Sequence, residues 1–178
     1  MTCAALVLPV VAAASTVMAL SLEELTHRSA LVVHGVVQRA QPLKTDSGQI
    51  WTYAEVSVRE VLKGRTDSAT VVVKQPGGVV GPIGQSVAGA ATFIPDEEVV
   101  LFLEPATDER DAFVTLGLAL GKVTLELRNG QRVANRHLDG LNLMQRGDGS
   151  PRPVDSFEKL GNADAVLAKI RRSAEVQR

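Results

Sequence analysis

The chain has 178 residues, a formal net charge of −1 and an estimated isoelectric point near 6.3. Its length supports one well-cored domain rather than two. Because the net charge is close to zero and aromatic residues make up only 3% of the chain, the composition argues against nucleic-acid binding, which needs a basic surface or aromatic stacking platforms.

The N-terminal segment has the composition of an export signal. Residues 4–20 are almost wholly apolar or small, and Val17-Met18-Ala19 offers the small side chains that signal peptidases prefer. We expect a signal peptide over residues 1–19, a mature chain from Leu20, and a periplasmic, outer-envelope or extracellular location with no membrane span after processing. The alternative is a buried N-terminal strand or helix, since no Lys or Arg precedes the apolar run.

Cys3 is the only cysteine and lies inside this segment. A processed chain would contain no cysteine. We therefore expect no disulfide, no zinc cluster and no cysteine nucleophile.

The mature chain reads as a short helix followed by strands. Ser21 and Glu24 form a capping box for a helix that ends near Arg28. Short β-branched runs predict the strands, and they cover residues 30–38, 50–62, 69–74, 98–103, 112–118, 121–127 and 131–134. Many short strands with few helices predict a mainly β fold, an OB-like antiparallel barrel over residues 20–134.

The C-terminal part is predicted to be a loop and then a helix. Residues 135–154 are rich in Gly, Pro and Asp, which favour loops. Residues 155–173 have apolar side chains at helical spacing, and Asp155 or Ser156 could cap the helix. We expect this amphipathic helix to pack on the barrel.

The connection that begins at Gln75-Pro76-Gly77-Gly78 is the densest run of Gly and Pro in the chain. No Gly-Lys-Ser/Thr follows it, so it is not a phosphate-binding loop, and no Gly-x-Ser-x-Gly nucleophile turn is present. We predict a loop whose path is set by backbone torsions, with Gly77 and Gly78 as tentative binding positions.

Trp51 and Tyr53 are the other candidate binding residues. They alternate onto the same strand face as Arg59, opposite the apolar face. Exposed aromatic rings two residues apart could stack on a sugar or grip a partner. The alternative is that the C-terminal helix covers both rings.

The titratable residues do not predict a reaction centre. His27, His34 and His137 lack metal-ligand spacing, and His34 fits a hydrogen-bonded strand histidine better. Asp96-Glu97-Glu98 reads as a solvated acidic turn before a strand. We therefore predict no catalytic residue, no metal and no cofactor.

The order of these segments resembles a known group of proteins. Ser21-Leu22-Glu23-Glu24-Leu25, the strand from Ala30 to Val37, Val61-Leu62-Lys63-Gly64, the Gln75-Pro76-Gly77-Gly78 loop and the run from Val99 to Leu103 resemble uncharacterised exported bacterial OB-like barrels. Those proteins are distantly similar to the tissue-inhibitor-of-metalloproteinases and netrin-like superfamily. The resemblance covers about residues 21–127 and implies a fold rather than a function.

The inhibitory mechanism of that superfamily does not transfer to this chain. It uses an N-terminal cysteine to chelate the zinc of the target, and the expected mature N-terminus here is Leu20. We predict a non-catalytic exported module that binds a protein or cell-envelope component. The alternatives are a protease inhibitor that presents the loop from Gly77 to Ala91 and, third, an enzyme with a dispersed site. The oligomeric state is left open.

Overall fold

The computed structural model describes residues 15–144, 151–153 and 157–176. Within these ranges the protein is mainly β, with a short helix near its N-terminal end and a longer one near its C-terminal end, as the sequence predicts. The elements are β1 (Ser15–Met18), α1 (Leu22–Arg28), β2 (Leu31–Lys44), β3 (Ile50–Lys63), β4 (Thr70–Pro76), β5 (Gly78–Val80), β6 (Ile83–Gln85), β7 (Glu98–Pro105), β8 (Ala112–Thr115), the 3-10 helix η1 (Leu118–Gly121), β9 (Lys122–Arg128), β10 (Gln131–His137), β11 (Leu141–Met144), β12 (Pro151–Pro153), β13 (Phe157–Asn162) and α2 (Ala163–Glu175).

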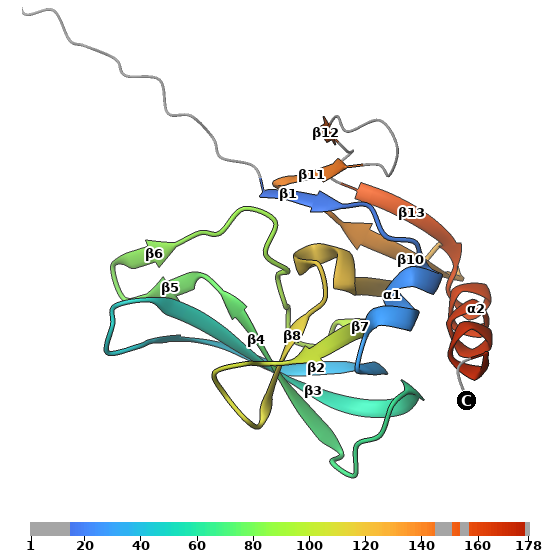
Figure 1. Cartoon of the computed structure of the whole chain (residues 1–178), viewed down its shortest axis with the longest axis horizontal. Helices are drawn as coiled ribbons and strands as arrows, with labels where there is room; N and C mark the ends of the chain where they lie inside the picture. Colours follow the sequence, from blue (N-terminus) through green and yellow to red (C-terminus); the bar gives the residue numbers. More distant parts are fainter. Residues whose placement is uncertain (1–14, 145–150, 154–156, 177–178) are drawn as a thin grey trace, which may run out of the picture.

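The largest sheet is ring-like. Its strand order is β13-β10-β9-β7-β2-β3-β4-β8, and β8 pairs a second time, with β7. All of these pairings are antiparallel except that of β4 with β8. Strands β7, β2, β3, β4 and β8 therefore form a ring, and β9, β10 and β13 continue the sheet from β7 (Figure 1).

Two hydrophobic cores lie on the two sides of this sheet. Core 1 fills the ring and contains Val33 of β2, Val56 of β3 and Val73 of β4. Core 2 joins the sheet to the helices and contains Leu25 of α1 and Ile170 of α2, both fully buried. Since the side chains of a strand alternate between faces, one strand can supply both cores.

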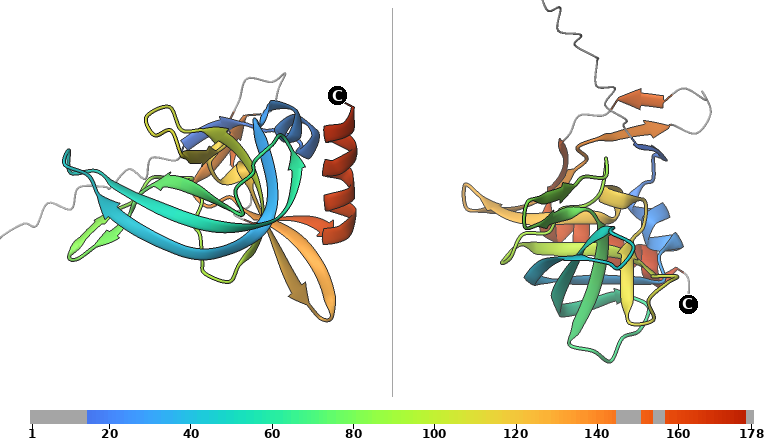
Figure 2. Two further views of the ribbon diagram at one scale, coloured as in Figure 1. Left: turned by 90° about the horizontal axis from the view of Figure 1, so that it is seen from below. Right: turned by 90° about the vertical axis from the view of Figure 1, so that its left-hand side faces the viewer.

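The remaining elements stand beside the ring. Strands β1, β11 and β12 form a separate sheet in which β1 and β11 are parallel. Strands β5 and β6 form a hairpin that extends in the same direction as the far ends of β2 and β3, while α2 lies at the opposite end of the molecule (Figures 1 and 2).

The N-terminal helix is as predicted. Ser21 Oγ accepts a hydrogen bond from Glu24 N at 3.2 Å, and Glu24 Oε2 accepts one from Ser21 N at 2.9 Å. This capping box starts α1 at Leu22, and the helix ends at Arg28.

The end of the predicted signal segment takes part in the fold. Strand β1 pairs with β11 over Ser15–Met18, and Val17 packs against core 1. Leu20 is buried in core 2. Cys3 and the rest of the predicted signal segment lie outside the described residues. No helix in the described ranges is both long and apolar enough to cross a membrane.

The C-terminal helix begins later than predicted. It starts at Ala163, and its Asn162 cap accepts a hydrogen bond from Ala165 N at 3.0 Å. Residues 157–162 form β13 instead, which pairs with β10. Gly161 has a φ of +99°, which is outside the helical region, so the helical interpretation of this stretch was wrong. The predicted caps, Asp155 and Ser156, lie outside the described residues.

The predicted loop over residues 135–154 also contains strands. Strand β10 continues to His137, and β11 and β12 follow it. In contrast, β8 is shorter than the predicted strand over residues 112–118, because Gly117 and Leu118 adopt φ values of +68° and +60° and turn the chain into η1.

Ion pairs connect the first turn of α2 to the sheet. Arg132 of β10 contacts Asp164 at 2.6 Å and Glu98 Oε1 at 2.7 Å. His34 Nε2 lies 2.7 Å from the same Glu98 oxygen, and Arg59 lies 3.1 Å from it. The hydrogen-bonded strand histidine that the sequence predicts is thus confirmed for His34.

The same network reaches the end of α2. His34 Nδ1 lies 4.0 Å from Glu60 Oε2, and Arg171 donates to both oxygens of Glu60 at 2.8 and 2.7 Å. The Arg171 hydrogen bonds are the main reason that the pKa of Glu60 is below its ordinary value. Alternating charges therefore fix both ends of α2 to the sheet.

We expect Glu98→Gln to lower the free energy of unfolding by about 1–3 kcal/mol at pH 7, since it removes a carboxylate that three side chains hold. Desolvation alone would raise the pKa of Glu98, but His34, Arg132 and Arg59 together hold it below its ordinary value of 4.5. The stabilisation by Glu98 is therefore complete above about pH 4.5 and is lost as the pH falls through the lower pKa of the folded state.

Urea unfolding of the wild type and Glu98→Gln across pH 3–7 measures this difference. The exposed Glu175→Gln is the control and should follow the wild type. A difference between wild type and Glu98→Gln that does not shrink at low pH contradicts the ionic role of Glu98.

Candidate functional site

The predicted aromatic residues lie together, but neither ring is fully exposed. Trp51 and Tyr53 are half-buried, and Lys74 Nζ lies 4.4 Å from the Trp51 ring centroid and 5.9 Å from that of Tyr53. Tyr53 donates to Glu109 Oε2 at 2.9 Å. Lys74 and the loop that contains Asp108 and Glu109, rather than α2, therefore occupy this face.

Lys74 is held tightly in this cluster. It is 4% exposed and donates to Asp108 at 2.9 Å and to Glu109 at 3.3 Å. Burial alone would lower the pKa of Lys74, but the two carboxylates raise it above its ordinary value. The contacts of Trp51 and Tyr53 are thus with groups of the protein itself, and the cluster stabilises the outer face of β3 and β4.

Arg59 lies apart from the aromatic pair. It is half exposed and pairs with Glu98 in the network beside α2. The structure therefore does not bring Arg59 into one site with Trp51 and Tyr53.

Gly77 and Gly78 lie where the chain leaves β4 for the β5–β6 hairpin. Gly77 N donates to Ile50 O at 2.8 Å, and Thr52 Oγ1 donates to Gly77 O at 2.7 Å. Gly78 has a φ of +139°, and a Cβ atom there would lie 2.7 Å from both Pro42 Cβ and Thr52 Oγ1. Gly78 is thus required by the close approach of three chain segments.

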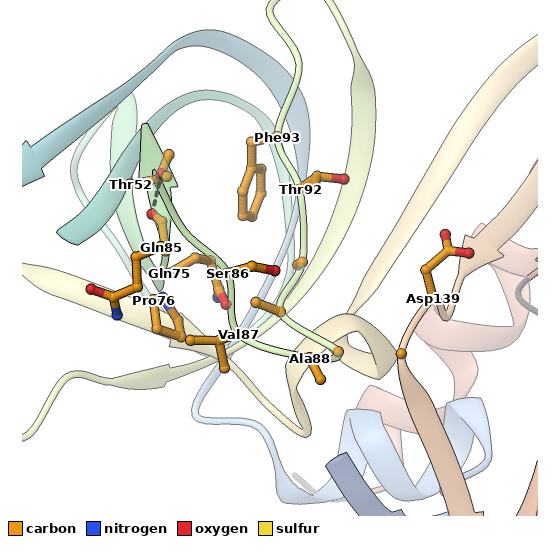
Figure 3. Close-up of a pocket in the computed structure, with 16 residues that line it drawn as sticks. Thr52, Gln75, Pro76, Gln85, Ser86, Val87, Ala88, Thr92, Phe93 and Asp139 are labelled. Atoms are coloured by element: carbon orange, nitrogen blue, oxygen red, sulfur yellow. Dashed lines mark hydrogen bonds between the residues drawn. The ribbon is translucent and has the colours of Figure 1, made fainter. Parts of the chain in front are cut away.

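These two glycines line a groove of about 620 Å³ (Figure 3). Its other lining residues are Thr52 of β3, residues 75–76 and 85–93, and residues 139–140 of the turn between β10 and β11. Asp139 lies across the opening from Gln85 and Pro76 (Figure 3). The volume of the groove falls in the range of small-ligand sites.

One wall of the groove, residues 85–93, is fixed at several points. Gln85 Oε1 accepts from Ile50 N at 2.9 Å, and Gly89 O accepts from Ala119 N at 2.9 Å. Gly140 allows a second contact in the middle of the wall, because a Cβ atom at this glycine would lie 2.9 Å from Gly89 N. The wall is therefore preorganised.

The far end of the wall is fixed by an ion pair that the sequence does not predict. Lys122 Nζ lies 2.6 Å from Glu97 Oε2 and also donates to Thr92 O. Thr124 donates to the other Glu97 oxygen at 2.9 Å. Burial lowers the pKa of Lys122, although Glu97 opposes this shift.

The prediction of a solvated acidic turn is thus wrong for Glu97 and Glu98. Their side chains are only 14% and 22% exposed, because Lys122 of β9 and His34 of β2 approach them from strands that lie far away in sequence. Only Asp96 of the three is exposed.

The side chains that line the groove are of the kinds found in binding sites rather than in metal sites. Phe93 and Ala91 supply buried apolar surface, and Gln75 is fixed by a hydrogen bond from its Nε2 to Thr115 Oγ1 at 2.7 Å. Asp139 is the one charged side chain among the described lining residues. In the described ranges, no group of three or more His, Cys, Asp or Glu residues is placed to hold a metal ion.

Sequence reasoning found part of the groove. It selected Gly77 and Gly78 and, in the inhibitor alternative, the loop from Gly77 to Ala91, but Asp139 lay in a predicted loop and Phe93 in an unassigned stretch. The density of Gly and Ala between residues 77 and 91 was the available signal.

No protein-family model matches this sequence, and no curated protein is significantly similar to it.

We expect Gly78→Ala to lower the free energy of unfolding by about 3 kcal/mol, since it adds backbone strain and a clash with Pro42 and Thr52. Gly81→Ala is the matched control, because Gly81 has a φ of +58° but no atom within 4 Å of the added Cβ. It should cost only about 1 kcal/mol. Urea unfolding measures both, and equal losses would contradict a packing role for Gly78.

Proposed function

We propose that this protein is a non-catalytic binding module whose groove holds an extended peptide segment. The observation that carries the proposal is the groove of about 620 Å³ with its fixed wall at residues 85–93. A wall that is already ordered loses little conformational entropy when a ligand binds.

The composition of the lining favours a peptide. Many of the lining residues are Gly or Ala, including Gly77, Gly89 and Ala90. Small side chains leave room for the main chain of an extended peptide to lie close to the wall of the groove. The partly exposed Val87 would offer apolar surface to a side chain of the ligand.

The charge of the lining favours a basic ligand. Asp139 is a carboxylate, and the described lining residues include no Lys or Arg. A Lys or Arg side chain of the peptide that lies opposite Asp139 would gain an ion pair.

The ring of strands supports an OB-like antiparallel barrel as the fold. The pairings of β8 with both β4 and β7 favour this assignment, since they link the two ends of the strand order β7-β2-β3-β4-β8. The sequence resemblance to exported OB-like barrels related to the metalloproteinase-inhibitor and netrin-like superfamily supports the same fold, and the apolar N-terminal segment favours an envelope or extracellular location.

An array of random hexapeptides, probed with the purified full chain, tests the binding function. We expect selected peptides to contain Lys or Arg, and we expect Ser86→Trp to weaken their binding about tenfold, because this exposed lining residue would then narrow the groove. Fluorescence anisotropy of the selected peptides measures the affinities.

One control variant and one further test variant make this result specific. Gln131→Trp adds the same side chain at an exposed position outside the groove and should bind as the wild type does. Asp139→Asn should reduce the preference for basic peptides. Absence of any peptide ligand, or equal binding by Ser86→Trp and the wild type, overturns the proposal.

Export has its own test. Expression from the native start, followed by intact-mass analysis of cell fractions, should give a chain that begins at Leu20 in an exported fraction. Such cleavage removes β1, the parallel partner of β11, and the contact of Val17 with core 1. A full-length cytoplasmic product would contradict export and would make β1 a permanent part of the fold.

A further inference from the structure

A buried arginine lies outside the groove and is only partly hydrogen-bonded. Arg136 of β10 is 3% exposed, and its Nη1 donates to Glu158 Oε2 at 3.2 Å. Its Nε and Nη2 atoms are buried and have no hydrogen-bond partner within the described part of the chain. Burial lowers the pKa of Arg136, while Glu158 opposes this shift.

Such an arrangement is energetically unfavourable. A buried donor without an acceptor destabilises a protein by about 1–3 kcal/mol, and by more when it is charged. Proteins rarely retain such groups without a bound water, ion or ligand. The two free atoms, Nε and Nη2, also form one edge of the guanidinium, which is the edge that can hold a carboxylate in a bidentate manner.

Arg136 lines two adjoining cavities. One of about 410 Å³ lies toward α2 and also includes Leu160 and Lys169, and one of about 540 Å³ lies toward β11 and also includes Leu143 and Phe157. Leu20, Ser21, Arg136, Glu158 and Lys159 line both cavities.

The larger cavity has an apolar part away from Arg136. Its other walls include Leu120, Leu138, Leu143 and Phe157. Among the described lining residues the charged side chains are Arg136, Lys159 and Glu158, whose net charge is positive. The Glu158 side chain is 46% exposed and accepts from Nη1, which leaves the Nε and Nη2 edge free for a second anion.

We propose that this cavity binds a fatty carboxylate, with the carboxylate on the Nε and Nη2 edge of Arg136 and the acyl chain against Leu143 and Phe157. The apolar walls favour an acyl chain over the C-terminus of a peptide, since the amide groups of a peptide would lose their hydrogen bonds to water there. This site is separate from the proposed peptide groove and does not depend on it.

Isothermal titration of the full chain with decanoate, below its micelle concentration, tests the site. We expect saturable one-to-one binding and a higher thermal unfolding midpoint, because the ligand binds the folded state. The NMR signal of the Arg136 Nε–H group in the wild type should shift on titration. Methyl decanoate, which lacks the charge, and acetate, which lacks the chain, should each bind at least about tenfold more weakly.

Variants separate the head of the ligand from its tail. Arg136→Met should weaken decanoate binding about tenfold or more, and it keeps a side chain that can pack in the core. Leu143→Trp, which fills the apolar end of the cavity, should also weaken decanoate binding about tenfold. It replaces Arg136→Met as the test if that variant does not fold. Arg39→Met, at an exposed arginine that pairs with Glu55, is the matched control and should bind as the wild type does.

Each contrary result has a definite meaning. Equal binding of methyl decanoate, or unchanged binding by Arg136→Met, overturns the role of the guanidinium. Equal binding of acetate overturns the role of the acyl chain. Tighter binding of acetyl-Leu-Leu-Leu with a free carboxylate than of decanoate overturns the fatty ligand in favour of a peptide C-terminus.

Discussion

Strand β7 holds the molecule together, because it supplies both cores at once. Val99, Leu101 and Leu103 enter core 1, while Val100 and Phe102 enter core 2, and all of them are fully buried. One edge of β7 pairs with β2, and the other pairs with β9 along its first half and with β8 along its second. The ring and the strands that continue from it therefore depend on a single strand.

Two carboxylates at the start of β7 also position the groove wall and helix α2. Glu97 pairs with Lys122 and fixes the far end of the groove wall, while the adjacent Glu98 pairs with His34 and Arg132 and fixes α2. Since neighbouring side chains of an extended chain point to opposite sides, one dipeptide can anchor both. The groove wall and the helix are thus positioned by the same segment that organises the cores.

The sequence predicted the local features well, because their causes are local. The capping box at Ser21 and the strands around β3 and β7 follow from patterns within a few residues. The errors arose where distant chain segments decide the outcome. Strand β13 forms because β10 offers it an edge, although the spacing of Phe157 and Leu160 also fits a helix.

The same limit explains what was missed in the candidate site. Gly77 and Gly78 could be selected from composition, but their neighbours across the groove, such as Asp139, come together only through the turn between β10 and β11. The burial of Glu97 and Lys74 likewise requires partners on other strands. Only tertiary pairing converts these ordinary surface residue types into buried ion pairs.

The two buried cations Arg136 and Lys122 differ in how fully the protein itself pairs their charge. Lys122 has the Glu97 carboxylate, the Thr92 carbonyl and the Phe93 ring around it, so its charge is matched by groups of the protein itself. Arg136 is buried to a similar degree, but within the described part of the chain it has one carboxylate contact and a donor edge without an acceptor. Replacing a buried charge with an apolar side chain is often neutral or stabilising, so stability alone gives no reason to retain this arginine. A ligand that uses the free edge supplies that reason, and the apolar walls on one side of Arg136 indicate its chemistry.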